Sequence, residues 1–131
     1  MLLALCMEII MRLKNILIVV EDMERSKKFF KEVLGLDVIR DFNTNVILTQ
    51  GLVLQERKSW EQTIEAQVNY GGEDMVLYFE EYDLEAFQEK LDRSGWNIRF
   101  CNRLQILENG QKMIRFRDPD GHMIEIREIK L

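Results

Sequence analysis

The chain has 131 residues, of which 47% are hydrophobic, enough for one ordinary domain with a buried core. Its formal net charge is −5 and its pI is about 5.0, which argues against a nucleic-acid-binding protein because such proteins need a basic surface. Two cysteines, Cys6 and Cys101, are too few for a disulfide scaffold and match a reducing, cytoplasmic location.

The first residues are apolar, but they do not have the pattern of a membrane segment. No basic region precedes residues 1–7, and Glu8 interrupts the apolar run. The run is too short to span a bilayer and is a poor secretory signal. We therefore expect no membrane association, and we interpret residues 1–10 as an N-terminal extension of a single domain at residues 11–131.

The first half of the chain predicts one strand, one helix and three further strands. Residues 14–20 form an apolar run bounded by charge, as in a buried strand. Asp22 is placed to cap a helix whose apolar stripe includes Phe29 and Phe30, and Gly35 is placed to end it. Three short strands separated by turn residues follow, at residues 36–40, 46–49 and 52–56.

The second half repeats this order about 60 residues later. A strand at residues 75–80 precedes a helix that Asp83 caps and Gly95 ends, and three strands follow, at residues 96–101, 112–117 and 123–128. The predicted fold is therefore α+β, with two β-α-β-β-β modules that form a sheet-lined cleft. The modules cover about residues 13–57 and 75–129, and a linker at residues 58–74 joins them.

The segment around Asp118-Pro119-Asp120-Gly121 predicts a tight hairpin. Proline presets φ, and glycine tolerates the positive φ at which the turn re-enters a strand. A three-residue loop pairs Asp118 with His122 and keeps apolar residues opposite one another, whereas a two-residue loop would mix the faces. This register puts Arg115 opposite Glu125, a cross-strand pair that contributes roughly 0.2–1 kcal/mol. His122 is then expected to be a solvent-exposed turn residue.

Two segments together resemble the vicinal oxygen chelate superfamily, which contains glyoxalase I, bleomycin-resistance proteins and extradiol dioxygenases. One segment is Val20 to Ser26 leading to Phe29-Phe30 and Leu34-Gly35-Leu36, and the other is Asp118 to Gly121 leading to Ile124-Glu125-Ile126. With the module order, the resemblance covers about residues 13–129. It implies a glyoxalase/bleomycin-resistance/dioxygenase-like fold. Because the two units of such proteins often pair across a dimer, we also expect a homodimer.

The resemblance also implies where a metal would bind. Members that resemble glyoxalase I carry one ligand on the first strand and one on the last strand of each unit. Carried over to this chain, these positions hold Asn15, Gln55, Val76 and Glu125, of which only Glu125 retains a family ligand type. A two-histidine iron site is excluded because His122 is the one histidine in the sequence. We expect no catalytic transition metal, although Glu125 with Asn15 and Gln55 could hold a divalent cation weakly.

Two hypotheses of different classes describe the function, beside a third in which the chain is an interaction module without a ligand. In the first, a metal-free protein binds a small organic ligand, as bleomycin-resistance-like members do. In the second, Glu125 acts as the catalytic base or supports a metal in a glyoxalase-like lyase or isomerase, or in a dioxygenase. The residues expected to contact the ligand are Asn15, Leu17, Val53, Gln55, Val76, Tyr78, Arg115, Met123 and Trp60.

Overall fold

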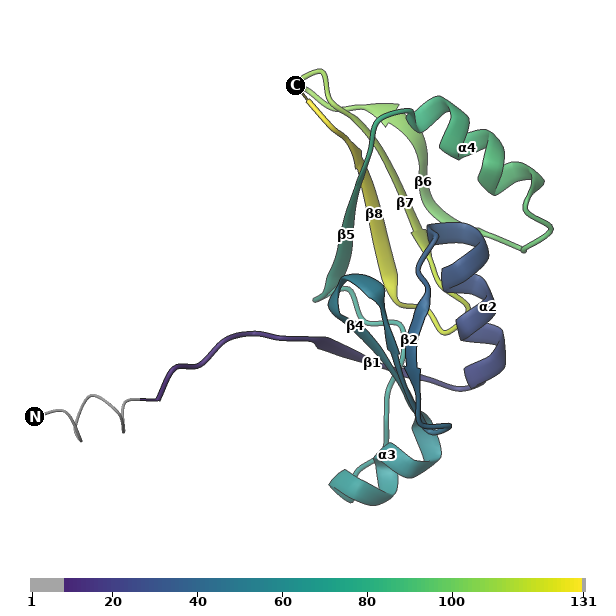
Figure 1. The fold of residues 1–131 in the computed structure, drawn as a ribbon. Helices are drawn as coiled ribbons and strands as arrows, with labels where there is room; N and C mark the ends of the chain where they lie inside the picture. Colours follow the sequence, from purple (N-terminus) through teal and green to yellow (C-terminus); the bar gives the residue numbers. More distant parts are fainter. Residues whose placement is uncertain (1–8, 131) are drawn as a thin grey trace, which may run out of the picture.

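The computed structural model describes residues 9–130 (Figure 1). The first module contains one strand, one helix and three further strands, with a short 3-10 turn and a second helix near its end. The elements in chain order are β1 (Ile16–Val20), α2 (Met23–Leu34), β2 (Val38–Asp41), β3 (Asn45–Leu48), η1 (Thr49–Gly51), β4 (Leu52–Glu56), α3 (Arg57–Ile64), β5 (Val76–Glu81), α4 (Leu84–Arg93), β6 (Arg99–Ile106), β7 (Lys112–Arg117) and β8 (Met123–Glu128).

Each module forms its own four-stranded sheet. The N-terminal sheet has the order β1-β4-β3-β2 and the C-terminal sheet has the order β5-β8-β7-β6, so the second sheet repeats the topology of the first. β1 pairs with β4 in parallel, and β5 pairs with β8 in parallel. The other pairs in both sheets are antiparallel. This confirms the predicted fold of two β-α-β-β-β modules.

The caps of the two main helices also repeat. The Asp22 carboxylate accepts a hydrogen bond from the backbone N–H of Arg25, and the Asp83 carboxylate accepts one from the backbone N–H of Ala86, at 3.1 and 3.0 Å. Each bond satisfies an amide that the helix itself leaves unpaired. Gly35 ends α2 with φ +71°, a conformation that costs glycine little.

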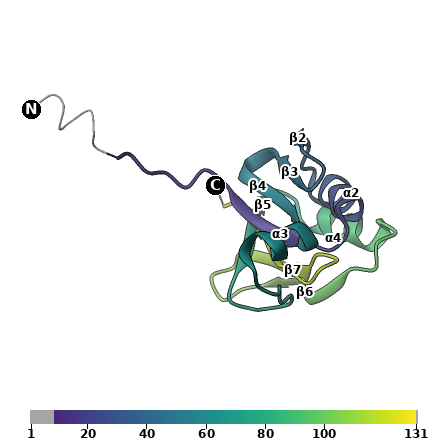
Figure 2. The same cartoon turned by 90° about the horizontal axis from the view of Figure 1, so that it is seen from below.

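Helices α2 and α4 lie on the same side of the two sheets, and one core runs between them (Figure 1). Figure 2 shows this arrangement from below. The Phe29 ring meets the Trp96 ring edge-on at 5.3 Å between centroids, which joins the first module to the second. Such a pair adds about 0.5–1.5 kcal/mol beyond the area that it buries.

The strand predicted at residues 96–101 is shifted. β6 begins at Arg99 and continues to Ile106, whereas Trp96 lies before the strand and packs into the shared core. Trp96 also donates its indole N–H to Glu32 on α2. The prediction began the strand too early because the apolar residues before Arg99 serve the contact between modules and not a β ladder.

The hairpin register that places the polar residues is confirmed. Arg115 pairs with Glu125 across β7 and β8, and the backbone N–H of Asp118 donates to the carbonyl of His122 at 3.0 Å. Gly121 has φ +97°, the left-handed conformation expected after the turn. This register places Glu125, Arg115 and Met123 on the face of the C-terminal sheet that points away from the helices.

The structure describes only part of the predicted N-terminal extension at residues 1–10. Residues 9–15 form no helix or strand, whereas most of the predicted extension, Cys6 included, lies outside the described part of the chain. In residues 9–130, every helix is too short or too polar to cross a membrane.

Candidate functional site

A cavity of about 250 Å³ lies where the two sheets meet. Edge strands β1 and β5 contribute Leu17, Val19 and Val76 to its lining, and the start of β8 contributes Met123. These side chains alternate with core residues along their strands, so they face away from the helices. The cavity brings together three residues predicted to contact a ligand, namely Leu17, Val76 and Met123.

The segment that joins the modules covers one side of this cavity. Residues 68–72 line it, and the Tyr70 ring lies edge-on to the His122 imidazole with 6.1 Å between centroids. The Tyr70 hydroxyl donates to the Glu21 carboxylate at 3.4 Å. Burial, together with the negative charges of Asp120 and Glu21, raises the pKa of the Tyr70 phenol, so the hydroxyl keeps its proton. The segment thus contributes Tyr70 as an aromatic wall.

His122 lines the same cavity and is only 22% exposed at its side chain. The expectation that it is a solvent-exposed turn residue was therefore wrong. Its Nδ1 lies 2.7 Å from Oδ2 of Asp118, whose side chain is fully buried. An ionised carboxylate can only accept, which assigns a hydrogen to Nδ1, and in the neutral imidazole Nε2 is then the acceptor. Nε2 has no partner among residues 9–130, and it is not among their buried unpaired atoms.

Asp118, Asp120 and His122 form a cluster of metal-ligand types among residues 9–130, with one ligand atom of each within 4.8 Å of the others. The two carboxylates, however, already have hydrogen-bond partners. Asp118 Oδ1 accepts from the backbone N–H groups of Asp120 and His122, at 3.0 and 2.7 Å. Asp120 Oδ1 accepts from Nη2 of Arg25 at 2.8 Å. These bonds favour a structural role in which the turn is held against the start of α2.

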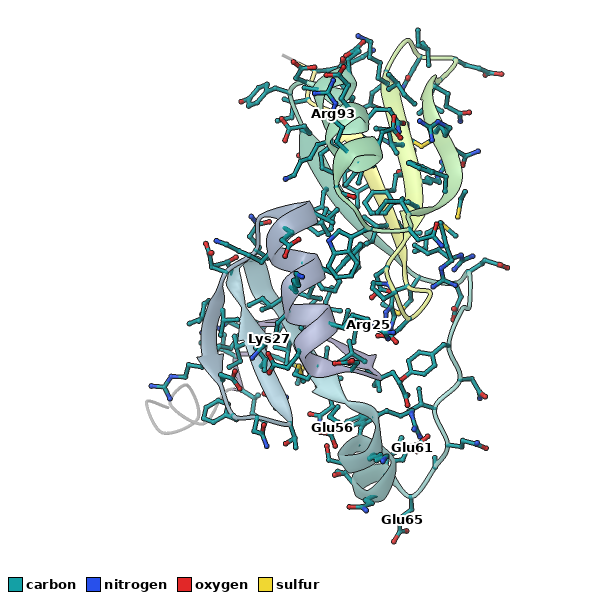
Figure 3. The ribbon with its side chains drawn as sticks, turned by 90° about the vertical axis from the view of Figure 1, so that its right-hand side faces the viewer. Arg25, Lys27, Glu56, Glu61, Glu65 and Arg93 are labelled. Atoms are coloured by element: carbon teal, nitrogen blue, oxygen red, sulfur yellow. The ribbon has the colours of Figure 1, made fainter. Side chains whose placement is uncertain are left out.

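Asp120 is buried at this contact, with 3% of its side chain exposed. Burial and the nearby charge of Asp118 raise its pKa, against the opposing effects of the Glu21 backbone N–H and the Arg25 guanidinium. Figure 3 shows Arg25 on the side of α2 that faces the β7–β8 turn.

Glu125 lies between two arginines on the open face of the C-terminal sheet. Arg115 donates from Nε to Oε1 of Glu125, and Arg127 donates from Nε to Oε2 at 2.8 Å. Each arginine also donates from Nη1 to a neutral side chain, to Asn102 at 3.1 Å and to Gln111 at 3.2 Å. We call these five residues the arginine–glutamate cluster.

The two arginines decide the charge state of Glu125. Burial alone raises its pKa, but hydrogen bonds from Arg115 and Arg127 outweigh burial and hold the pKa below the ordinary value of 4.5. A carboxylate in this state is a weak base, and its oxygens are engaged. The prediction paired Glu125 with Arg115 but missed Arg127. Arg127 stands two residues after Glu125 on the same strand, so the alternation of strand side chains could have revealed it.

The family model described as a glyoxalase-like domain matches residues 13–129 of this sequence. The chain belongs to the glyoxalase-like domain family. This confirms the resemblance drawn from the two sequence segments, and the match spans both modules.

Individual proteins and solved structures are also similar to this glyoxalase-like chain. A structure of a protein of unknown function from Agrobacterium tumefaciens is 33% identical, covers 95% of this chain and 99% of that protein, and has a TM-score of 0.82. Glutathione transferase FosA from Serratia marcescens is 26% identical over 119 residues, which are 87% of this chain and 78% of FosA. A glyoxalase-related enzyme from Fulvimarina pelagi, 18% identical, covers 92% of this chain and 89% of that chain with a TM-score of 0.77, which shows the fold alone.

The metal positions implied by the resemblance do not fit a metal in this glyoxalase-like chain. Val76 offers only hydrocarbon, and both oxygens of Glu125 are bound by arginine. Asn15 precedes β1, whereas Gln55 pairs with Val19, so along the parallel strands these two amides are about four residues, or roughly 13 Å, apart. Within one chain, Asn15 and Gln55 therefore do not join Glu125 in one ligand set.

The remaining predicted ligand contacts are dispersed. Gln55 accepts from Asn45 and donates to Ser59, both at 2.9 Å, so its amide is used within the N-terminal module. Val53 is 5% exposed beside β1. Trp60 lies on α3, which stands at the end of the molecule away from the C-terminal sheet (Figure 1), and it does not line the cavity.

Proposed function

We propose that this glyoxalase-like protein binds a small organic ligand and works without a catalytic transition metal. The observation that carries this proposal is the pair of arginines bound to Glu125. A base or a metal ligand needs a free oxygen lone pair, and Arg115 and Arg127 compete for those of Glu125. The other three implied ligand positions hold two amides and a valine, which supports the same conclusion.

The cavity between the sheets is the proposed binding site. Its volume of about 250 Å³ lies just below the usual range for drug-sized ligands, roughly 300–1,000 Å³, so we propose a compact ligand. Leu17, Val76 and Met123 would contact its apolar part, and Nε2 of His122 would accept a hydrogen bond from it. A mostly apolar lining with a few polar residues, here His122, Asn69 and Asp74, is typical of sites that orient small molecules.

The enzyme alternative rests on different observations. The Asp118, Asp120 and His122 cluster has suitable ligand types, and one relative is described as a glutathione transferase. The internal bonds of Asp118 and the ion pair of Asp120 weigh against a metal there, because a cation would have to displace them. We therefore rank metal-dependent lyase, isomerase or dioxygenase activity below binding.

Assembly and location follow as further parts of the proposal. Apolar side chains on the open faces of β1 and β5 remain partly exposed, with Leu17 at 38%, Val76 at 43% and Tyr78 at 53%. Covering them in a homodimer would remove apolar surface from water. Cys101 is a free, exposed thiol, which suits the cytoplasm. Light scattering after size-exclusion chromatography tests the dimer, and a monomer at micromolar concentration would contradict it.

Binding can be tested with benzamide, a compact neutral probe, by NMR titration of the Leu17 and Met123 methyl groups. Val76→Trp should fill the cavity and reduce the affinity at least about tenfold, whereas Val38→Trp, at a valine of matched exposure on β2, should leave it unchanged. The valines are 43% and 45% exposed. No methyl shifts in the wild type, or equal effects of both variants, would contradict the proposed site.

The metal-free part of the proposal needs a separate measurement. Elemental analysis of protein purified without chelators should find nickel, zinc, manganese and iron well below one ion per chain. A stoichiometric ion would overturn it, and loss of that ion in Asp120→Asn would assign it to the turn cluster.

A further inference from the structure

The arginine–glutamate cluster carries more positive than negative charge. Arg115 and Arg127 together bring two positive charges to the single negative charge of Glu125, and Asn102 and Gln111 are neutral. Glu80 is the backbone neighbour of Arg127 on β5, but its carboxylate makes no ion pair with it within 4.0 Å. A positive site therefore lies on the surface of a chain whose net charge is −5.

One ion pair would not require both arginines. Arg115 alone neutralises Glu125 and is its cross-strand neighbour. Arg127 adds a second guanidinium that is only 27% exposed, which costs hydration free energy unless an anion compensates it. This excess of partly buried positive charge points to a negatively charged ligand.

The two guanidinium groups are held in place and are not saturated. In both arginines the Nε and Nη1 donors are used, by Glu125 and by a neutral side chain. No bond from Nη2 of either arginine is found within residues 9–130, and neither atom is among their buried unpaired atoms. The Arg127 guanidinium also lies over the Tyr78 ring, 5.7 Å from its centroid. Fixed planar donors bind oxyanions well because little side-chain freedom is lost on binding.

The cluster continues directly from the cavity. Met123 lines the cavity, and Glu125 follows two residues later on the same face of β8, roughly 7 Å along the strand. Val76 and Tyr78, the β5 neighbours of these two residues, extend the same surface. A ligand with an apolar body in the cavity can therefore place a charged group at the arginines.

We infer that the arginine–glutamate cluster is an oxyanion site that binds the carboxylate or phosphate group of an organic ligand whose apolar part occupies the cavity. This inference rests on the proposed function for the position of the apolar part. Glu125 then offsets one of the two positive charges, and it does not react with the ligand.

The experiment uses three probes with the full chain. Benzoate and benzamide have nearly the same shape but differ in charge, and inorganic phosphate tests the cluster without the cavity. Binding is followed through the Nε–Hε NMR signals of Arg115 and Arg127 and the methyl signal of Met123. Benzoate should bind at least about tenfold more tightly than benzamide, and phosphate should shift the arginine signals.

The variants separate this role from a catalytic one. Glu125→Gln removes the negative charge at the site, so it should tighten benzoate binding at least about threefold, whereas loss of a metal ligand would weaken it. Arg127→Gln should weaken benzoate binding at least about tenfold without changing benzamide binding. Arg93→Gln, at an exposed arginine on α4, changes the net charge equally and should have no effect (Figure 3).

The outcomes distinguish the inference from the proposed function. Equal affinity for benzoate and benzamide, or weaker benzoate binding in Glu125→Gln, would overturn the oxyanion site. The proposal that the cavity binds the ligand would not be affected by either result. Phosphate shifts at the arginines without any benzamide binding support the oxyanion site and count against the cavity. The comparison of the two probes in the wild type needs no variant, so it remains decisive if Arg127→Gln fails to fold.

Discussion

Asp120 and Arg25 are 95 residues apart in sequence, yet their side chains meet at 2.8 Å and join the two modules. Asp120 lies in the turn between β7 and β8, and Arg25 lies in the first turn of α2. The two segments that carry the family resemblance are therefore in contact. Each supplies local structure to its own module, and together they attach the C-terminal turn to the N-terminal helix.

Asp120→Ala should destabilise the protein by about 1–2 kcal/mol, because it leaves Arg25 without its acceptor in a partly buried place. Asp120→Asn should destabilise the protein clearly less than Asp120→Ala. It keeps an oxygen for Arg25, and the raised pKa of Asp120 means that its ionised form is disfavoured at this site. Urea unfolding at pH 7 measures both variants.

The matched control for this contact is Asp92→Asn, which breaks a surface pair with Arg103 at 2.7 Å. Both partners are well exposed, so the change should lie within about 0.5 kcal/mol. If Asp120→Ala cost no more than Asp92→Asn, the contact between modules would not contribute to stability.

Glu125→Gln should be less stable than the wild type near neutral pH, and the difference should shrink in acid. The folded-state pKa of Glu125 lies below its ordinary value of 4.5. Its ion pairs therefore stabilise the fold fully above about pH 4.5, and this contribution is lost as the pH falls through the lowered pKa. Unfolding free energies of both proteins between pH 3 and pH 7 test this, and a difference that is independent of pH would contradict the ion pairs.

Gly121→Ala should both destabilise the protein and alter the cavity. Gly121 has φ +97°, and a Cβ atom there would lie 3.3 Å from Cα of Gly71 in the segment that covers the cavity. Gly95→Ala is the control, because Gly95 also has a positive φ but has no atom within 4 Å of the added Cβ. Each substitution should lower the free energy of unfolding by about 1–2 kcal/mol because of backbone strain. Gly121→Ala should lower it further because of the contact with Gly71.

The readout that separates the two glycine variants is the NMR signal of Met123. Gly121→Ala should shift it because the covering segment moves, and Gly95→Ala should not. Equal stability losses with no shift in either variant would show that the Gly71 contact does not shape the cavity.

Trp60→Ala should leave benzamide binding unchanged, because α3 does not line the cavity. Tyr70→Ala should weaken binding, because Tyr70 forms part of the lining. Both affinities are measured at a temperature well below the thermal unfolding midpoint of each variant, so that the protein is folded. The reverse result would mean that the segment after β4 folds over the ligand with Trp60 inside.

Much of the fold could be predicted because its signals are local. Asp22 and Asp83 cap their helices in the predicted places, and β7 and β8 have the predicted bounds. The register that pairs Arg115 with Glu125 followed from the turn residues and the alternation of apolar positions. The start of β6 was missed because Trp96 packs against Phe29, a contact between distant parts of the chain.

The sequence by itself determined the module order, the hairpin at Asp118 and the presence of a carboxylate at position 125 with an arginine beside it. Capping, turn chemistry and strand alternation act over a few residues, so they can be seen in the sequence. Only the tertiary structure decided that Asp118 holds His122 beside the cavity and that Asn15 lies far from Gln55. These relationships depend on side-chain direction and on how two sheets meet, and those are decided by packing across the whole domain.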